Sequence, residues 1–205
     1  MEQFLAVAAA HFLALLVPGV DFFLVARTAM SSGWRSASGM CVGIATANAV
    51  IIATAFSGTA LASHPLVHHA IQVFGGIFLL YVGLAFVLAD AEIDLSERPQ
   101  ATGRTWLANL GLGLTSGLLN PKNYMFYVSL SALLVGSSPL TLVLYGTWMA
   151  WLVLSWDLFV AFALGSWRMR ARLTKTLPWL TRLAGVFLLV FGLGMLLELA
   201  AEVLW

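Results

Sequence analysis

The chain has 205 residues, of which 61% are hydrophobic and only 9% are charged, and its mean hydropathy is +0.95. Soluble domains contain roughly 25% charged residues, so this composition excludes an ordinary water-soluble domain. The formal net charge is +1, and no dense basic run with interleaved aromatic side chains occurs, which argues against nucleic acid as a partner.

Six apolar stretches follow one another along the chain, each long enough for a membrane-spanning helix. They cover residues 4–30, 38–61, 70–89, 106–135, 140–165 and 183–204. The sequence therefore predicts an all-α integral membrane protein with six transmembrane helices, in a single domain over residues 1–205. No Lys or Arg precedes the first stretch, so we expect a retained helix and not a cleaved signal peptide.

The first stretch is interrupted by Pro18 and Gly19 and carries Asp21 among apolar residues. Proline leaves the carbonyl four residues earlier without its helical partner, and glycine tolerates an unwound backbone. A carboxylate within a span costs roughly 2.5 kcal/mol or more. The alternative to a functional site is a simple kink in which a structural partner satisfies Asp21. Intramembrane acids usually mark a transport path, so we expect function.

The second stretch contains Cys41 and Asn48. Cys41 is the only cysteine, so it forms no internal disulfide, and we expect a buried small side chain. Asn48 is one of few strongly polar residues within the predicted spans, and we count it among the candidate substrate-binding residues.

The fourth stretch is interrupted in the same way, at Asn120, Pro121 and Lys122. Here proline frees the carbonyl of Gly117 and an ammonium group follows directly. An ion pair between Lys122 and Asp21 is the simple interpretation. Buried ion pairs give little net stability because desolvation offsets attraction. The functional interpretation is therefore that a zwitterionic solute competes for both partners.

The fifth stretch carries Asp157 between Trp156 and Leu158. Two interpretations stay open: a proton carrier inside the membrane, or a residue at headgroup level in an aromatic belt. His11 is expected to be a packed polar residue. His64, His68 and His69 lie close together without a further ligand, so no metal site is expected, and no cofactor is implied.

Nine of the ten basic residues lie at alternate connectors between the stretches. They are Arg27 and Arg35 at the first connector, Arg98 and Arg104 at the third, and Arg168, Arg170, Arg172, Lys175 and Arg182 at the fifth. By the positive-inside rule these connectors face the cytoplasm, so both termini are predicted outside it.

An internal repeat relates the two interrupted stretches. Pro18 and Pro121 are separated by 121 − 18 = 103 residues, and the same offset pairs Gly33 with Gly136. The chain thus divides into a repeat of about residues 1–90, a linker of about 91–105 and a repeat of about 106–205. Three spans per repeat invert the second relative to the first. Inverted repeats with broken first and fourth helices are typical of secondary transporters, whose sites lie near the midplane.

These motifs resemble those of the LysE/RhtB amino-acid exporters over essentially the whole chain. The family's Pro-Gly-Pro motif followed by Asp or Asn is matched by Pro18, Gly19 and Asp21, and its Asn-Pro-Lys motif by Asn120, Pro121 and Lys122. Val20 replaces the second proline, and Asn48 stands near where many members have an acid.

The resemblance implies a secondary active exporter in the prokaryotic plasma (inner) membrane, which moves an amino acid or close derivative out of the cytoplasm with the proton motive force. A homodimer would also fit it. The substrate would contact Pro18, Gly19, Asp21, Asn120, Pro121, Lys122 and Asn48. Because an amide carries no proton, Asp21 and Asp157 are the candidates for proton coupling.

Two other classes of function compete with export. Membrane thiol-disulfide carriers have a similar size, but dithiol exchange needs a second thiol and Cys41 has none to pair with, so we do not expect an enzyme. A polytopic scaffold with merely kinked helices is the remaining alternative.

Overall fold

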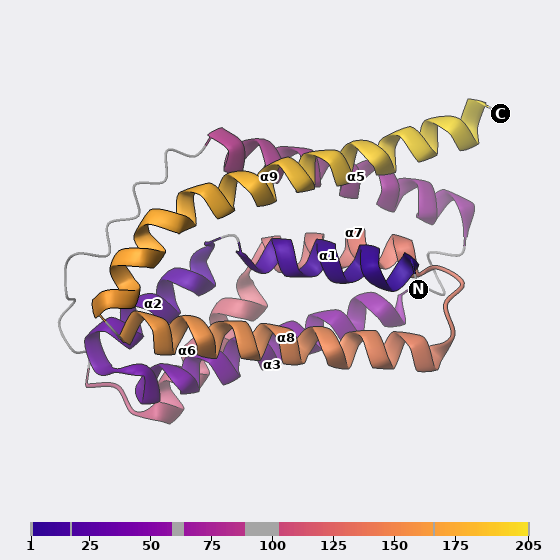
Figure 1. Ribbon diagram of the computed structural model, residues 1–205. Helices are drawn as coiled ribbons and strands as arrows, with labels where there is room; N and C mark the ends of the chain where they lie inside the picture. The colour runs from indigo at the N-terminus through magenta and orange to yellow at the C-terminus, as the bar shows by residue number, and fades with distance from the viewer. Residues whose placement is uncertain (1, 17, 59–63, 89–102, 166, 205) are drawn as a thin grey trace.

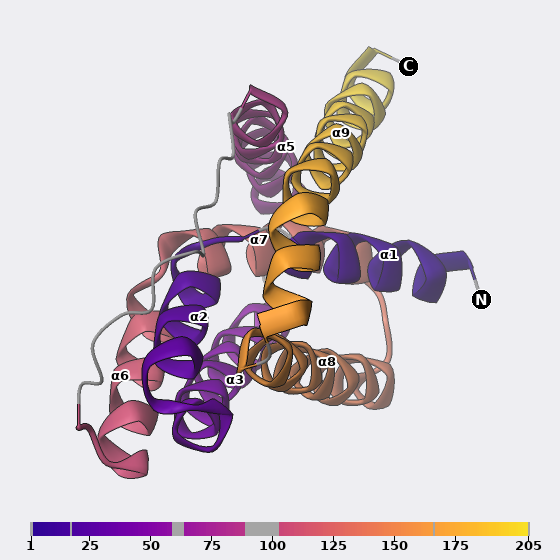
Figure 2. The same cartoon turned by 60° about the vertical axis from the view of Figure 1, so that its left-hand side comes forward.

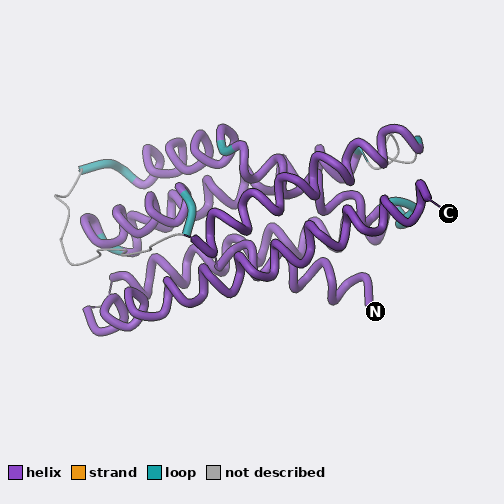
Figure 3. Tube along the Cα trace, turned by 90° about the horizontal axis from the view of Figure 1, so that it is seen from above, coloured by secondary structure: helices purple, strands orange, loops and turns teal. Residues whose placement is uncertain are grey.

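The fold is that of a computed structural model in which residues 2–16, 18–58, 64–88, 103–165 and 167–204 are described. Helices make up almost all of these ranges, and no strand occurs within them (Figure 3). The all-α prediction is confirmed for this part of the chain. The helices run along one long axis, and the two termini lie at the same end of the molecule (Figure 1).

The first half of the chain begins with a broken helix. Its elements are α1 (Glu2–Leu16), α2 (Val20–Ser32), α3 (Trp34–Ser57) and α5 (Pro65–Leu88). The break between α1 and α2 contains Pro18 and Gly19, as predicted, and the two helices meet at 52°. Gly33 separates α2 from α3 with a φ of 83°, a left-handed conformation that glycine adopts without steric cost.

The second half repeats this order. Its elements are α6 (Trp106–Leu119), α7 (Pro121–Ser131), the 3-10 turn η1 (Ala132–Leu134), α8 (Pro139–Gly165) and α9 (Trp167–Leu204). The predicted break at Pro121 is confirmed, because α6 ends at Leu119 and proline opens α7 at its first position, where its missing N–H costs nothing. Gly136 precedes α8 with a φ of 81°, which matches Gly33 in the first half.

The predicted connector between the fifth and sixth stretches lies between two apolar spans, which end at Leu164 and resume at Pro178. It is helical and not a loop, because helix α9 already begins at Trp167 and includes Pro178 in its interior. Residues 168–175 are mostly Arg, Leu, Met, Ala and Lys, which favour helix. Of the predicted linker, residues 91–102 lie outside the described ranges, and 103–105 lead into α6.

Four helices are long and apolar enough to cross a membrane by themselves. They are α3, α5, α8 over Pro139–Leu164 and α9 over Pro178–Glu202, and the bent pair α1 and α2 gives a fifth span if counted as one. Helix α6 is apolar but has only 14 residues. Length and composition therefore support four or five spans, and the break at Pro121 explains why the fourth predicted stretch is not one long helix.

The helices form layers around the two broken segments. In Figure 2, α5 and the C-terminal part of α9 lie side by side on one side, α1 and α7 lie in the middle, and α2, α3, α6 and α8 lie on the other side, which the start of α9 also reaches. Glycines bring α5 and α9 together: a Cβ on Gly83 would lie 2.8 Å from the carbonyl oxygen of Gly185, and the reverse distance is also 2.8 Å. Such close backbone approach is how helices associate in lipid.

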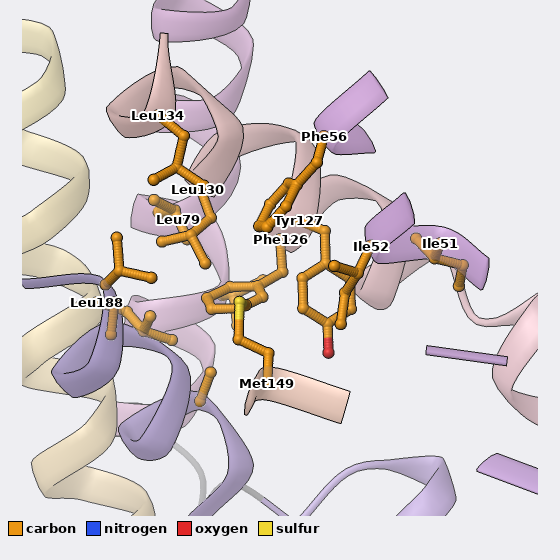
Figure 4. Close-up of a cluster of buried hydrophobic side chains, with 14 of the residues drawn as sticks. Ile51, Ile52, Phe56, Leu79, Phe126, Tyr127, Leu130, Leu134, Met149 and Leu188 are labelled. Carbon is orange, nitrogen blue, oxygen red and sulfur yellow. The ribbon is translucent and has the colours of Figure 1, made fainter. Parts of the chain in front are cut away.

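Two apolar clusters fill the interior. The first cluster joins α2, α3 and α8 around Val25, Met40 and Leu164. The second cluster surrounds α7 and draws on α1, α3, α5, α8 and α9; Figure 4 shows Phe126, Leu130 and Leu188 within it. The polar residues described next lie between the two clusters.

Candidate functional site

A small polar cavity of about 60 Å³ is built from five different helices and the two breaks. Its lining consists of His11, Ala14, Leu15, Gly19, Asp21, Phe22, Ile44, Asn48, Asn120, Lys122, Asn123, Phe126, Tyr127, Val153, Trp156 and Asp157. Members of both apolar clusters contribute, so the cavity lies between them. Of the residues predicted from the sequence, six line it, while Pro18 and Pro121 form the adjoining breaks.

The first break places a carboxylate at a helix start. Helix α2 begins directly after Gly19, with Asp21 in its first turn, where unpaired backbone N–H groups favour negative charge. Gly19 also approaches the second break closely, since a Cβ added to it would lie 3.4 Å from Lys122 Nζ. The two breaks therefore meet across the cavity.

The second break is organised by Asn120, which contacts both breaks. Its Oδ1 accepts a hydrogen bond from the backbone N–H of Lys122 (3.1 Å) and so caps α7, while its Nδ2 donates to Asp21 Oδ2 (3.1 Å). The carbonyl of Gly117, which Pro121 was predicted to free, accepts from Asn123 Nδ2 at 3.4 Å. Side-chain amides thus satisfy the interrupted backbone.

Asp21 is surrounded by neutral donors. Ser116 Oγ donates to its Oδ1 at 2.8 Å, and the side-chain amides of Asn120 and Asn123 donate to its Oδ2 at 3.1 and 3.3 Å. This donor set suits an ionised carboxylate, which only accepts hydrogen bonds. The arrangement leaves capacity for one further donor, since the two oxygens offer about four acceptor positions.

The ion pair between Asp21 and Lys122, the simple interpretation of the sequence, does not form. Within the described residues, Lys122 Nζ makes no ion pair or hydrogen bond, and it lies 5.7 Å from the centroid of the Phe86 ring. Neutral donors, and not the ammonium, make the hydrogen bonds to Asp21 in the described part of the chain, and they come from Ser116, Asn120 and Asn123. A cation in this setting needs an anionic partner, and the cavity is where such a partner would bind.

A second group of polar side chains also lines the cavity. Asn48 is buried; its Nδ2 donates to the carbonyl of Ile44 (2.9 Å) and its Oδ1 accepts from the hydroxyl of Tyr127 (2.9 Å). Asp157 is only 7% exposed and lines the cavity, which favours the interpretation of a carboxyl group inside the protein that could carry a proton. Its Oδ2 has no hydrogen-bond partner within the described residues.

His11 belongs to this second group. It is 1% exposed, its Nε2 lies 3.2 Å from the carbonyl oxygen of Met149, and its Nδ1 is buried without a partner in the described structure. His11 is therefore packed, as expected, but only one of its two ring nitrogens has a hydrogen-bond partner.

Sequence reasoning missed Ser116, Asn123 and Tyr127 as site residues. The sequence does contain a pattern that includes them: the polar residues 116, 120, 123 and 127 follow one another at intervals of four, three and four positions. Such spacing places side chains on one helical face, and here the polar face continues across the break at Pro121.

A larger groove of about 950 Å³ lies along α3 and α8, between residues such as Ala49, Ala53, Thr147 and Trp151. Its lining contains no charged side chain. A groove that offers neither charge nor a broken helix lacks the means to hold a charged solute in hydrocarbon, so the small polar cavity is the candidate site.

Of the histidines of the predicted exterior connector, His69 makes a contact between helices. His69 Nε2 lies 3.6 Å from Glu202 Oε2, between α5 and α9. No group of three or more metal-ligating side chains occurs among the residues the structure describes.

Comparison with known proteins adds a family and several relatives. The model of the family "LysE type translocator" matches residues 12–199. The threonine efflux protein of Escherichia coli K12 is 28% identical over 95% of this chain and 98% of its own length. The leucine efflux protein of Klebsiella pneumoniae is 31% identical over 56% of this chain and 55% of its own length. The uncharacterized membrane protein YrhP of Bacillus subtilis is 21% identical over 94% and 98%. No solved structure matches the chain.

Proposed function

The chain belongs to the LysE type translocator family, and from this premise we propose that it is a secondary active exporter of an amino acid or close derivative. Threonine and leucine are the solutes named for two relatives, so neutral amino acids are the first to test. The relationship to the threonine efflux protein extends over nearly the whole of both chains.

One observation carries the proposal: Asp21 and Lys122 line the same cavity without bonding to each other. A zwitterionic amino acid offers an ammonium for Asp21 and a carboxylate for Lys122, and the half-helix starts at both breaks add partial charges that favour bound ions. A scaffold protein has no use for an unpaired intramembrane ammonium, which disfavours that alternative.

We propose six membrane crossings in two inverted repeats. The paired breaks, the left-handed glycines Gly33 and Gly136 and the alternating direction of the helices in Figure 1 support this arrangement. On this view α1 with α2 and α6 with α7 are each one crossing, broken near the midplane, where irregular backbone is tolerated because it lines a polar cavity.

Alternating access would use the two apolar clusters as gates. The cavity has space for only a few water molecules, so the described state is closed around the site. The halves are not equivalent in this state, because α3 packs extensively on α6 whereas the corresponding pair, α8 and α1, makes much less contact. If the α3–α6 contact loosened while the α8–α1 contact tightened, the two halves would exchange their arrangements. The cavity would then open to one side of the membrane in one state and to the other side in the other state.

The proposed orientation places both termini outside the cytoplasm and the positively charged connectors inside, in the plasma (inner) membrane. A cysteine at His64 should be labelled by an impermeant thiol reagent in intact cells, and a cysteine at Arg172 should be labelled only after permeabilisation. Both side chains are exposed, whereas the native Cys41 is buried. Labelling of position 172 but not 64 in intact cells would reverse the orientation.

Proton coupling is part of the proposal. One charge moved through 100 mV yields about 2.3 kcal/mol, which corresponds to a solute gradient of roughly 50-fold. One proton per solute is therefore adequate, with Asp21 and Asp157 as the candidate carriers. The protein could act as a homodimer, but export does not require one, since residues of a single chain build the cavity.

Cells that overproduce the protein should release a preloaded labelled neutral amino acid faster than cells with the empty vector, and should tolerate higher concentrations of toxic analogues. The matched control is the Lys122→Ala variant produced at equal membrane level, which should behave like the vector. Equal release by all three strains, for every amino acid tried, would contradict export.

A further inference from the structure

Two buried side chains of the cavity each present a polar atom without a partner: Nδ1 of His11 and Oδ2 of Asp157. Both residues are more than nine-tenths buried. An unpaired buried polar atom lowers the stability of the folded protein by about 1–3 kcal/mol. Two such atoms in one cavity therefore indicate a function that offsets this cost.

The chemistry of each atom follows from its neighbours. Met149 offers a carbonyl, which only accepts, so the Nε2 of neutral His11 carries the hydrogen and its Nδ1 is a free base. An ionised carboxylate without a partner is far too costly in this environment. Asp157 is therefore suited to hold a proton in the state described here, and His11 is suited to accept one.

The two residues lie at different levels along α8. His11 contacts Met149, which precedes Asp157 by eight residues, about 12 Å of helix. No hydrogen bond joins His11 Nδ1 to Asp157 Oδ2, but the cavity that both residues line has space for a few waters. Helix α8 starts at the end where the termini lie (Figure 1), so His11 is nearer that end.

Asp21 differs from Asp157 in its hydrogen bonds. Three donors hold Asp21 in its acceptor form, whereas no hydrogen bond reaches Asp157 Oδ2. The other titratable groups around Asp157 are Asp21 on α2, Cys41 on α3, and Lys122 and Tyr127 on α7. On α9, Arg182 is exposed.

We propose that Asp157 carries the coupling proton and that His11 exchanges it with Asp157 through water in the cavity, while Asp21 stays ionised to bind the solute ammonium. In the cycle, Asp157 first releases its proton towards the other end of the molecule, which leaves a carboxylate. His11 Nδ1 then takes up a proton that enters through the cavity water, and the resulting imidazolium passes a proton through water to the Asp157 carboxylate, so both residues regain their starting states. This inference rests on the proposed export function.

The test separates solute movement from proton movement in proteoliposomes. Counterflow of labelled threonine and leucine at equal pH measures exchange, and accumulation under a pH gradient with a pH-sensitive dye inside measures coupling. Asp157→Asn should keep counterflow and lose both accumulation and solute-dependent proton flux, and Asp157→Glu should restore them. His11→Gln should keep counterflow and lose most of the proton flux.

His68→Gln is the matched control, because His68 also has a buried, unpartnered Nδ1 but does not line the cavity; it should resemble the wild type. Wild-type coupling in Asp157→Asn, or loss of counterflow together with coupling in a monodisperse Asp157→Asn protein, overturns the proposal. If that variant does not fold, His11→Gln decides, and an unchanged proton flux overturns the proposal. Absence of counterflow in the wild type would contradict the export function instead.

Discussion

Export is expected to be lost when Asp21 is replaced by Asn or Lys122 by Ala, while both variants still insert into the membrane. Neither change touches the apolar faces of the helices, and both residues line the cavity. Loss of one charged partner of a buried contact costs about 2–5 kcal/mol, which corresponds to roughly 30-fold to several-thousand-fold weaker binding. Asp21→Asn keeps the shape of the side chain and removes the charge, so it isolates electrostatics.

Initial rates of efflux from preloaded vesicles, normalised to the amount of monodisperse protein, measure this effect. Tyr124→Ala is the control for Lys122→Ala, since Tyr124 lies two residues further along α7, is 41% exposed and does not line the cavity. Efflux near the wild-type rate by either cavity variant would remove that residue from the site.

Replacement of Gly113 by Ala should destabilise the protein strongly, whereas the same change at Gly111, two residues earlier in α6, should be tolerated. A Cβ on Gly113 would collide with the carbonyl oxygen of Met40 on α3, while no atom lies within 4 Å of a Cβ on Gly111. Because the obstacle is backbone, relief requires the helices to move apart. Overpacking of this kind costs typically 1–3 kcal/mol and sometimes more.

Gly43→Ala provides an independent second variant, since its Cβ would meet the carbonyl oxygen of Leu110 across the same interface. Thermal unfolding followed by size-exclusion chromatography in detergent compares the variants. We expect Gly113→Ala and Gly43→Ala to unfold at clearly lower temperature and Gly111→Ala to match the wild type. Equal stability of Gly111→Ala and Gly113→Ala would contradict the close α3–α6 contact.

The breaks and their charged residues were predictable from the sequence because their causes are local. Proline removes a backbone donor wherever it occurs in a helix, and Asp21 and Lys122 are conspicuous in apolar stretches. The pairing of Gly33 with Gly136 was visible as a constant offset, and both residues adopt left-handed φ values.

Other features depend on contacts between distant parts of the chain. Ser116 is 95 residues from the carboxylate to which it donates, so no local pattern identifies it as a partner of Asp21. The burial of Asp157 depends on which helices surround α8. The helical start of α9 was missed because the apolar stretch covers only residues 183–204, although the Arg and Lys residues before it are good helix formers.

The central claim is that the solute binds between the two breaks, and protection of a reporter cysteine by substrate tests it most directly. Ala14 lines the cavity and is 8% exposed, so Ala14→Cys in a Cys41→Ala background that still transports is the reporter, with the exposed Arg172→Cys as control. Saturating threonine or leucine, whichever the protein exchanges, should slow labelling of position 14 by a small thiol reagent and leave position 172 unchanged. Unchanged labelling at position 14, with solute binding measured in the same sample, would contradict the claim.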